Sequence, residues 1–106
     1  MGVTFPRIQG ADIAEKVVEL GEGVTLEILN QRVIVYPWVR TAKFAEYEHV
    51  GSKCYGGFAE YAVVPATNTY CINSNLSDTQ LATLSCPYST AENMLTKARV
   101  SARDTV

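Results

Sequence analysis

The 106-residue sequence lacks the features of several large protein classes. Its nine Lys and Arg do not outnumber its eleven Asp and Glu, so the formal net charge is −2 and the basic excess that binds phosphate backbones is missing. The longest internal run without charge, residues 61–77, is interrupted by Pro65 and by many polar residues, unlike a membrane span. We therefore expect no nucleic acid and no membrane as a partner.

Signals for secretion and for disulfide bonding are also scarce. Pro6, Arg7 and Asp12 interrupt any apolar stretch after Met1, which is unlike a signal peptide, and a cytoplasmic location is expected. The cysteines are odd in number and include no Cys-x-x-Cys pair: Cys54, Cys71 and Cys86. We expect free thiols in a reducing compartment.

The sequence does contain enough apolar material for one globular domain. Hydrophobic residues make up 47% and charged residues 19%, a balance that favours a packed core over disorder. A chain of 106 residues has room for a single domain, 1–106, and not for a second.

Short strands are predicted between turn signals. Residues 11–20 alternate imperfectly between apolar and polar and end at a Gly-Glu-Gly turn. Residues 32–38 predict a strand that is apolar on both sides and hence buried on two faces. Residues 58–64, closed by Pro65, predict a third strand, and residues 69–72 predict a fourth.

Two helices are predicted toward the end of the chain. Ser77 lies three residues before Gln80, the spacing of a capping box, and predicts a helix that ends near Leu84. Ser89 and Glu92 repeat this spacing and predict a second N-cap. The second helix has an apolar face formed by Tyr88, Ala91, Met94, Leu95 and Ala98. The expected fold class is mainly β with short α-helices.

Five motifs, in this order along the chain, resemble the catalytic domain of the medium-chain dehydrogenases, the family of zinc-type alcohol dehydrogenases and quinone oxidoreductases. They are PRIQGADIA (6–14), VVELGEGV (17–24), QRV (31–33), GGFAEY (56–61) and CPYSTA (86–91). The resemblance implies a GroES-like, partly open β-barrel that is joined, in a complete enzyme, to a Rossmann domain binding NAD(P). We expect this chain to hold the GroES-like domain alone, truncated at both ends relative to the family.

The resemblance also implies which cofactors are missing. The family's first barrel strands and first cysteine ligand would precede Pro6, and they are absent. No glycine follows Gly57, so the glycine-rich loop that holds a dinucleotide pyrophosphate is absent too. We expect no cofactor in this chain, with NAD(P) bound only by full-length relatives.

The resemblance leaves only vestigial site residues. Where zinc-dependent relatives have Gly-His-Glu, this chain has Ala11 in place of the ligand histidine and Asp12 at the carboxylate position. Cys86 matches a later zinc cysteine, and Thr90 matches a position beside the nicotinamide. A catalytic zinc site needs three protein ligands, so we expect no metal and interpret Cys86 as a small buried residue.

Other residues are weaker candidates. The family's structural zinc lobe needs four cysteines, and only Cys54 lies between Trp38 and Gly57. We interpret His49, five residues before Cys54 in a loop-like stretch, as a solvated surface residue.

Two departures from the family pattern bear on the fold. Glu15 replaces a common glycine, which indicates that the surface at that strand has either changed its partner or become exposed. Asn30 tolerates a left-handed turn.

Two functional hypotheses follow. In the first, the chain is a fragment or truncated relative of a zinc-free NAD(P)-dependent alcohol dehydrogenase or quinone oxidoreductase, inactive alone, so that its status as an enzyme stays open. In the second, it is a stand-alone domain that binds a small-molecule ligand or self-associates. The missing strands and missing domain would uncover apolar surface at the second helix and a free edge near Ile13 and Val17. We expect a homodimer or a higher even oligomer, formed by strand-edge pairing or by helix packing.

Overall fold

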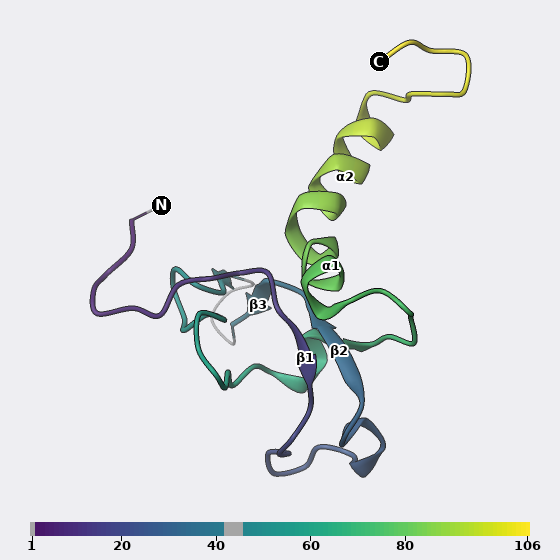
Figure 1. Ribbon diagram of the computed structural model, residues 1–106. Helices are drawn as coiled ribbons and strands as arrows, with labels where there is room; N and C mark the ends of the chain where they lie inside the picture. The colour runs from purple at the N-terminus through teal and green to yellow at the C-terminus, as the bar shows by residue number, and fades with distance from the viewer. Residues whose placement is uncertain (1, 42–45) are drawn as a thin grey trace.

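The computed structural model describes residues 2–41 and 46–106, which form two small sheets and a projecting helical arm (Figure 1). The strands are β1 (Ala14–Lys16), β2 (Arg32–Val35), β3 (Trp38–Arg40), β4 (Tyr47–His49) and β5 (Thr69–Cys71). The helices are α1 (Asp78–Ala82) and α2 (Ser89–Lys97), which are joined by the π-helical turn η3 (Leu84–Tyr88). Two 3₁₀ turns complete the fold, η1 (Leu26–Ile28) and η2 (Ala66–Asn68).

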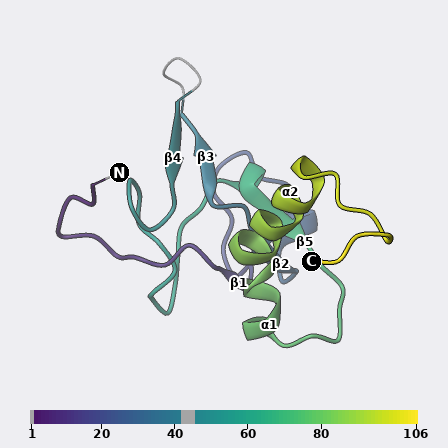
Figure 2. The same ribbon diagram turned by 90° about the horizontal axis from the view of Figure 1, so that it is seen from above.

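Both sheets are antiparallel. The first has the order β1-β2-β5, with Glu15 opposite Val33 and Val33 opposite Cys71, and the second pairs β3 with β4 (Figure 2). The two sheets do not close into a barrel within the described residues. The expected class, mainly β with short helices on a partly open GroES-like framework, is confirmed.

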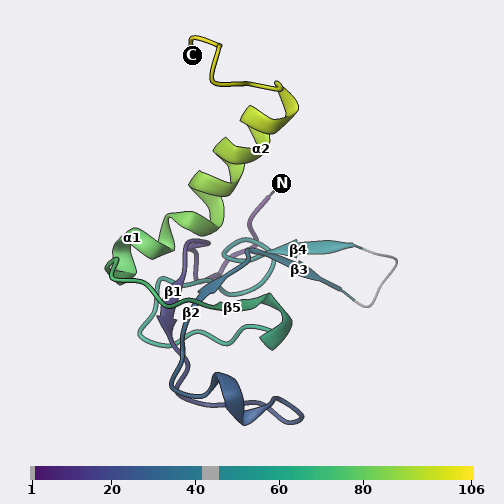
Figure 3. The same cartoon turned by 90° about the vertical axis from the view of Figure 1, so that its right-hand side faces the viewer.

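The core lies between the first sheet and α1. Val33 and Val35 are buried on β2, and Leu81 of α1 is fully buried. Arg32 fastens the helix to the sheet: its Nε donates to Asp78 Oδ1 at 2.6 Å, and its other guanidinium nitrogens donate to carbonyl oxygens of the loop before α1. α1 lies against β1 and β2, whereas α2 extends away from both sheets (Figure 3).

The strand predicted over residues 32–38 is divided in two, and it is not buried on both faces. Val33 and Val35 are buried, but Tyr36 is 45% exposed. Pro37 has no N–H to continue a ladder, so β2 ends at Val35. The Asn68 side-chain amide donates to the carbonyls of Tyr36 and Trp38, both at 2.9 Å, and holds the bend between β2 and β3.

The strand predicted over residues 58–64 is wrong. This segment is extended and bent but pairs with no strand in the described part of the chain. Its first amide, that of Phe58, donates to Gln9 O at 2.9 Å, and beyond this point the side chains of Tyr61 and Val63 are exposed. A β-prone sequence forms a strand only where a partner edge is available. The prediction for 69–72 is confirmed by β5.

Only one of the two predicted helix caps is confirmed. Ser77 Oγ accepts from the Gln80 amide, and the Gln80 side chain accepts from the Ser77 amide, which is a complete capping box. Ser89 caps nothing, because the chain is already helical through η3. Its hydroxyl instead donates to Ser85 O at 2.6 Å, the back-bonding typical of a serine inside a helix.

Turn residues behave as expected. The turn at Gly21–Gly23 ends the segment that contains β1, and Asn30 adopts a left-handed conformation with φ of 63°. Glu15 is exposed, which is one of the two predicted outcomes. Gly56 is required by close approach, because a Cβ there would collide with the carbonyl oxygens of Gln9 and Gly10.

In the described residues no helix has the length and apolar character needed to cross a membrane.

Candidate functional site

The motif at residues 6–14 contacts the helical arm, which consists of α1, η3 and α2, through Asp12. The backbone from Ile8 to Gly10 is fixed by the 56–58 segment, whose amides donate to it at 2.8–2.9 Å. The chain then turns toward β1, and the Ser85 hydroxyl lies 3.3 Å from Asp12 Oδ1 and 3.1 Å from Ala82 O, so its single proton is shared between these two acceptors. This hydrogen bond spans 73 residues of sequence and joins the Gly10-Ala11-Asp12 motif to the turn that carries Cys86.

The turn η3 is widened at the position of Cys86. Tyr88 N–H donates to Thr83 O, five residues earlier, at 3.2 Å, because Pro87 lies inside the helix and cannot donate. The widened turn points Ser85 inward, where it is buried. Cys86 is half-buried and not buried as predicted, since the neighbouring Ser85 takes the inward position. Thr90, in the first turn of α2, is exposed and lies outside this contact.

The residues present do not fit a zinc ion. A catalytic zinc needs three donors, and Ala11 has none to offer at the position where the resemblance implies a histidine. Within residues 2–41 and 46–106, no group of three His, Cys, Asp or Glu side chains is close enough to hold a metal. We derive no chemical step through zinc in this chain.

His49 and Cys54 have structural surroundings that form no metal site among the described residues. His49 ends strand β4 instead of lying in a loop, and its half-buried ring packs edge-on against Trp38 with the ring centroids 4.7 Å apart. The solvated position predicted for His49 is therefore wrong.

Burial raises the pKa of the Cys54 thiol, and the Glu48 carboxylate raises it further, while Arg7 opposes both. The thiol of Cys54 is consequently a poor nucleophile or ligand near neutral pH.

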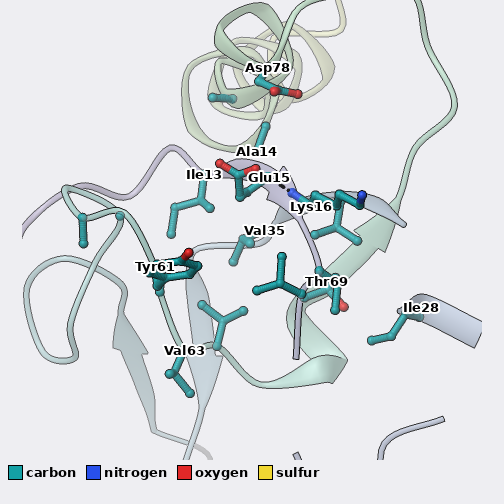
Figure 4. A pocket seen from close by; sticks show the side chains of 18 of the residues that line it. Ile13, Ala14, Glu15, Lys16, Ile28, Val35, Tyr61, Val63, Thr69 and Asp78 are labelled. Carbon is teal, nitrogen blue, oxygen red and sulfur yellow. Dashed lines mark hydrogen bonds between the residues drawn. The ribbon is translucent and has the colours of Figure 1, made fainter. Parts of the chain in front are cut away.

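A large hollow was not foreseen from the sequence. It has a volume of about 1090 Å³ and lies along β1, between α1 and the irregular 57–66 segment (Figure 4). Ile13, Val35, Tyr61 and Val63 form its apolar walls, and Glu15 and Lys16 lie at its upper margin. The signal in the sequence is the apolar run from Tyr61 to Val64, which predicts a strand instead of a cavity wall.

Comparisons with known proteins agree with the geometry. The alcohol dehydrogenase GroES-like domain family matches residues 1–74. The starvation-sensing protein RspB of Escherichia coli K12 is 30% identical over 113 aligned residues, which cover 96% of this chain and 33% of that protein. The chain thus spans about a third of the length of this curated relative.

Solved structures give the same fold. A protein of Sinorhizobium meliloti 1021, designated as an alcohol dehydrogenase, is 38% identical with a TM-score of 0.82, over 96% of this chain and 29% of that one. The short-chain alcohol dehydrogenase RspB of E. coli CFT073, solved with the cofactor NADH, is 27% identical with a TM-score of 0.83, over 93% of this chain and 32% of that one. The matched motifs, the open sheets and these likenesses place the chain in the alcohol dehydrogenase GroES-like domain family.

Proposed function

We propose that this chain is the substrate-side domain of a zinc-free, NAD(P)-dependent oxidoreductase of the alcohol dehydrogenase and quinone oxidoreductase type, acting in the cytoplasm. The 38% identity to the S. meliloti protein and the NADH bound to the RspB structure support this class. The three free cysteines fit a reducing compartment. In this proposal residues 1–106 form a single domain.

One observation carries the proposal: the hydrogen bond between Ser85 Oγ and Asp12 Oδ1. It joins the segments that carry Asp12 and Cys86, the two positions that match the family's reaction centre, and this supports the proposal. Asp12 is an exposed carboxylate, so it presents an acceptor to a substrate hydroxyl group. Asp12 would hold a substrate hydroxyl proton, while Cys86 and Thr90 are vestigial positions.

The hydride chemistry would belong to the nicotinamide, which a separate domain must supply when bound. Nothing among the described residues fits its pyrophosphate: α1 has only five residues and is capped by Ser77, and no glycine follows Gly57. We therefore expect the chain alone to show no turnover with NADH or NADPH. Heat-sensitive turnover by the purified chain would contradict the proposal.

A fusion tests the proposal in the positive direction. The chain replaces the corresponding 29% of the S. meliloti protein, with the rest of that protein unchanged, and NAD(P)-dependent turnover is measured on a panel of alcohols and quinones. We expect turnover that survives a metal chelator and falls at least about 100-fold in the fusion with Asp12→Ala, the range of a proton-transfer group. The same loss with Thr90→Ala, or a folded fusion without turnover, would contradict it.

A second candidate function is favoured by the hollow along β1. A cavity of about 1090 Å³ with apolar walls is of the size that takes small molecules. In this alternative the chain is a stand-alone binding or self-associating module. A saturable heat of binding for small apolar molecules, abolished by Val35→Asp without loss of helical signal, would favour it over the enzyme domain.

A further inference from the structure

The outer edge of β1 is open. Along β1 the odd-numbered residues bond to β2: Val35 N–H donates to Ile13 O at 3.1 Å, and Val17 N–H donates to Gln31 O at 2.9 Å. Backbone groups alternate in direction along an antiparallel strand, so those of Ala14 and Lys16 point to the other edge. No backbone hydrogen bond reaches that edge from any described residue.

The hollow follows this open edge. Its walls include residues of β1 from both faces of the sheet, together with Asp78 and Ala82 of α1 on one side and Tyr61 and Val63 on the other (Figure 4). Val63 is 98% exposed, and Val18, just beyond β1, is 59% exposed. A further strand would add to β1 at the usual spacing of about 4.8 Å and cover these side chains. The shape and the edge therefore fit an added strand better than a round ligand.

The charges along the edge indicate which strand fits. We propose that β1 pairs antiparallel with β1 of a second copy of this chain across a two-fold axis, with Ala14 opposite the partner's Ala14. This register places Asp12 opposite the partner's Lys16, and by symmetry Lys16 opposite the partner's Asp12. Each dimer thus gains two pairs of opposite charge, and the small side chain of Ala14 lies at the axis.

The registers shifted toward Glu15 and Lys16 are disfavoured by the same charges. Because only even-numbered residues bond outward, the register can shift only in steps that keep this alternation. One step places Glu15 opposite the partner's Glu15, and the next places Lys16 opposite the partner's Lys16. Like charges directly opposite one another destabilise a strand pair. The neighbouring register centred on Ile13 gains no charge pair, because it places Asp12 opposite the partner's Ala14. The register centred on Ala14 is thus the one that the charges of the edge favour.

Glu15 competes with the proposed pairing. The Lys16 amide, which points to the open edge, donates to Glu15 Oε1 at 2.9 Å. This contact occupies the donor that strand pairing needs, and charged side chains at an edge commonly oppose association. Glu15 is exposed and can turn away to solvent, so the pairing replaces one exposed hydrogen bond with a ladder. Removal of its carboxylate should therefore favour the dimer.

The test is the dimer dissociation constant, measured by analytical ultracentrifugation of the 106-residue chain at micromolar concentrations. Lys16→Asp places Asp opposite Asp12 twice per dimer and should raise the constant at least about tenfold. The double variant Asp12→Lys with Lys16→Asp restores opposite charges and should restore association. Glu15→Ala should lower the constant severalfold. Lys53→Asp makes the same charge change at an exposed site away from the edge and should leave it unchanged.

Two results would overturn the proposal. One is the monomer mass of 11.6 kDa at every concentration, which would leave the edge unpaired. The other is a dimer whose constant is the same for the wild type and for Lys16→Asp, both with native far-ultraviolet circular dichroism. That result would place the contact elsewhere, such as on the exposed apolar side chains of α2.

Discussion

The two helices of this chain begin from nearly the same sequence signal and end in opposite environments. α1 is capped by Ser77, fastened by Arg32 and packed through the fully buried Leu81. α2 is longer, yet none of its residues is buried, and Ser89 caps nothing. The comparison shows that helix length and helix signals do not decide what holds a segment in place. Tertiary burial does, because short helices are marginal in water without it.

The largest effect should come from emptying the core under α1. Leu81→Ala removes a side chain that is fully buried and should lower the free energy of unfolding by about 3 kcal/mol. Leu95→Ala, on α2 at 42% exposure, is the matched control and should cost less than about 1 kcal/mol. Urea denaturation measures both. Equal losses would mean that α2 is packed as firmly as α1, and the comparison would fail.

The next effect should come from the guanidinium that joins sheet and helix. Arg32→Ala removes the hydrogen bonds to Asp78 and to the loop carbonyls, and should cost about 1–2 kcal/mol. Asp78→Asn keeps the carbonyl contacts and removes only a partly exposed ion pair, so it should cost less than about 1 kcal/mol. If Asp78→Asn matched Arg32→Ala in urea denaturation, the ion pair and not the carbonyl contacts would hold α1.

The two serines give a direct comparison of the helix starts. Ser77→Ala breaks the capping box and should lower the free energy of unfolding by about 1 kcal/mol. Ser89→Ala removes only a hydroxyl that bonds back to Ser85 O and should change it by less than about 0.5 kcal/mol. Thermal denaturation followed by circular dichroism measures both variants. A larger loss for Ser89 would show that α2 does start at a cap.

The smallest expected effect is a pH dependence of stability that comes from Cys54, which follows strand β4 of the second sheet. Burial, assisted by Glu48, raises the pKa of Cys54 above its usual value of 9.0, so folding favours the neutral thiol. This stabilisation is complete below the unfolded pKa and is lost as pH rises through the higher folded pKa. Between wild type and Cys54→Ser, the difference in melting temperature should therefore shrink only in alkaline solution. A constant difference up to strongly alkaline pH would contradict the raised pKa.

The sequence predicted what depends on neighbours in the chain. The Ser77 capping box needs only Gln80, and the left-handed turn at Asn30 needs only the tolerance of its own side chain. Both predictions are confirmed. The resemblance also pointed to Asp12 and Cys86 as vestigial site positions, and the Ser85–Asp12 contact joins their segments, but a role for either residue stays a prediction.

Predictions from the sequence were wrong where the structure of a segment depends on a partner that is not in its local pattern. The 58–64 segment has the composition of a strand, but no described strand lies beside it to receive its hydrogen bonds. Ser89 has the spacing of a cap, but Pro87 and the wide turn of η3 had already made the chain helical there. His49 was read from its polar neighbours, whereas its position is set by Trp38 on a paired strand. None of these partners is visible in the local pattern.

The central proposal is that the chain keeps positions matching the family's reaction centre without a zinc site, because Ala11 stands where the resemblance implies a ligand histidine. Metal analysis of the purified chain after exposure to excess zinc and gel filtration tests it most directly. We predict less than stoichiometric zinc, and the same trace amount in Cys86→Ala. One zinc per chain that is lost in Cys86→Ala would contradict the account, since it would show that Cys86 and Asp12 complete a metal site.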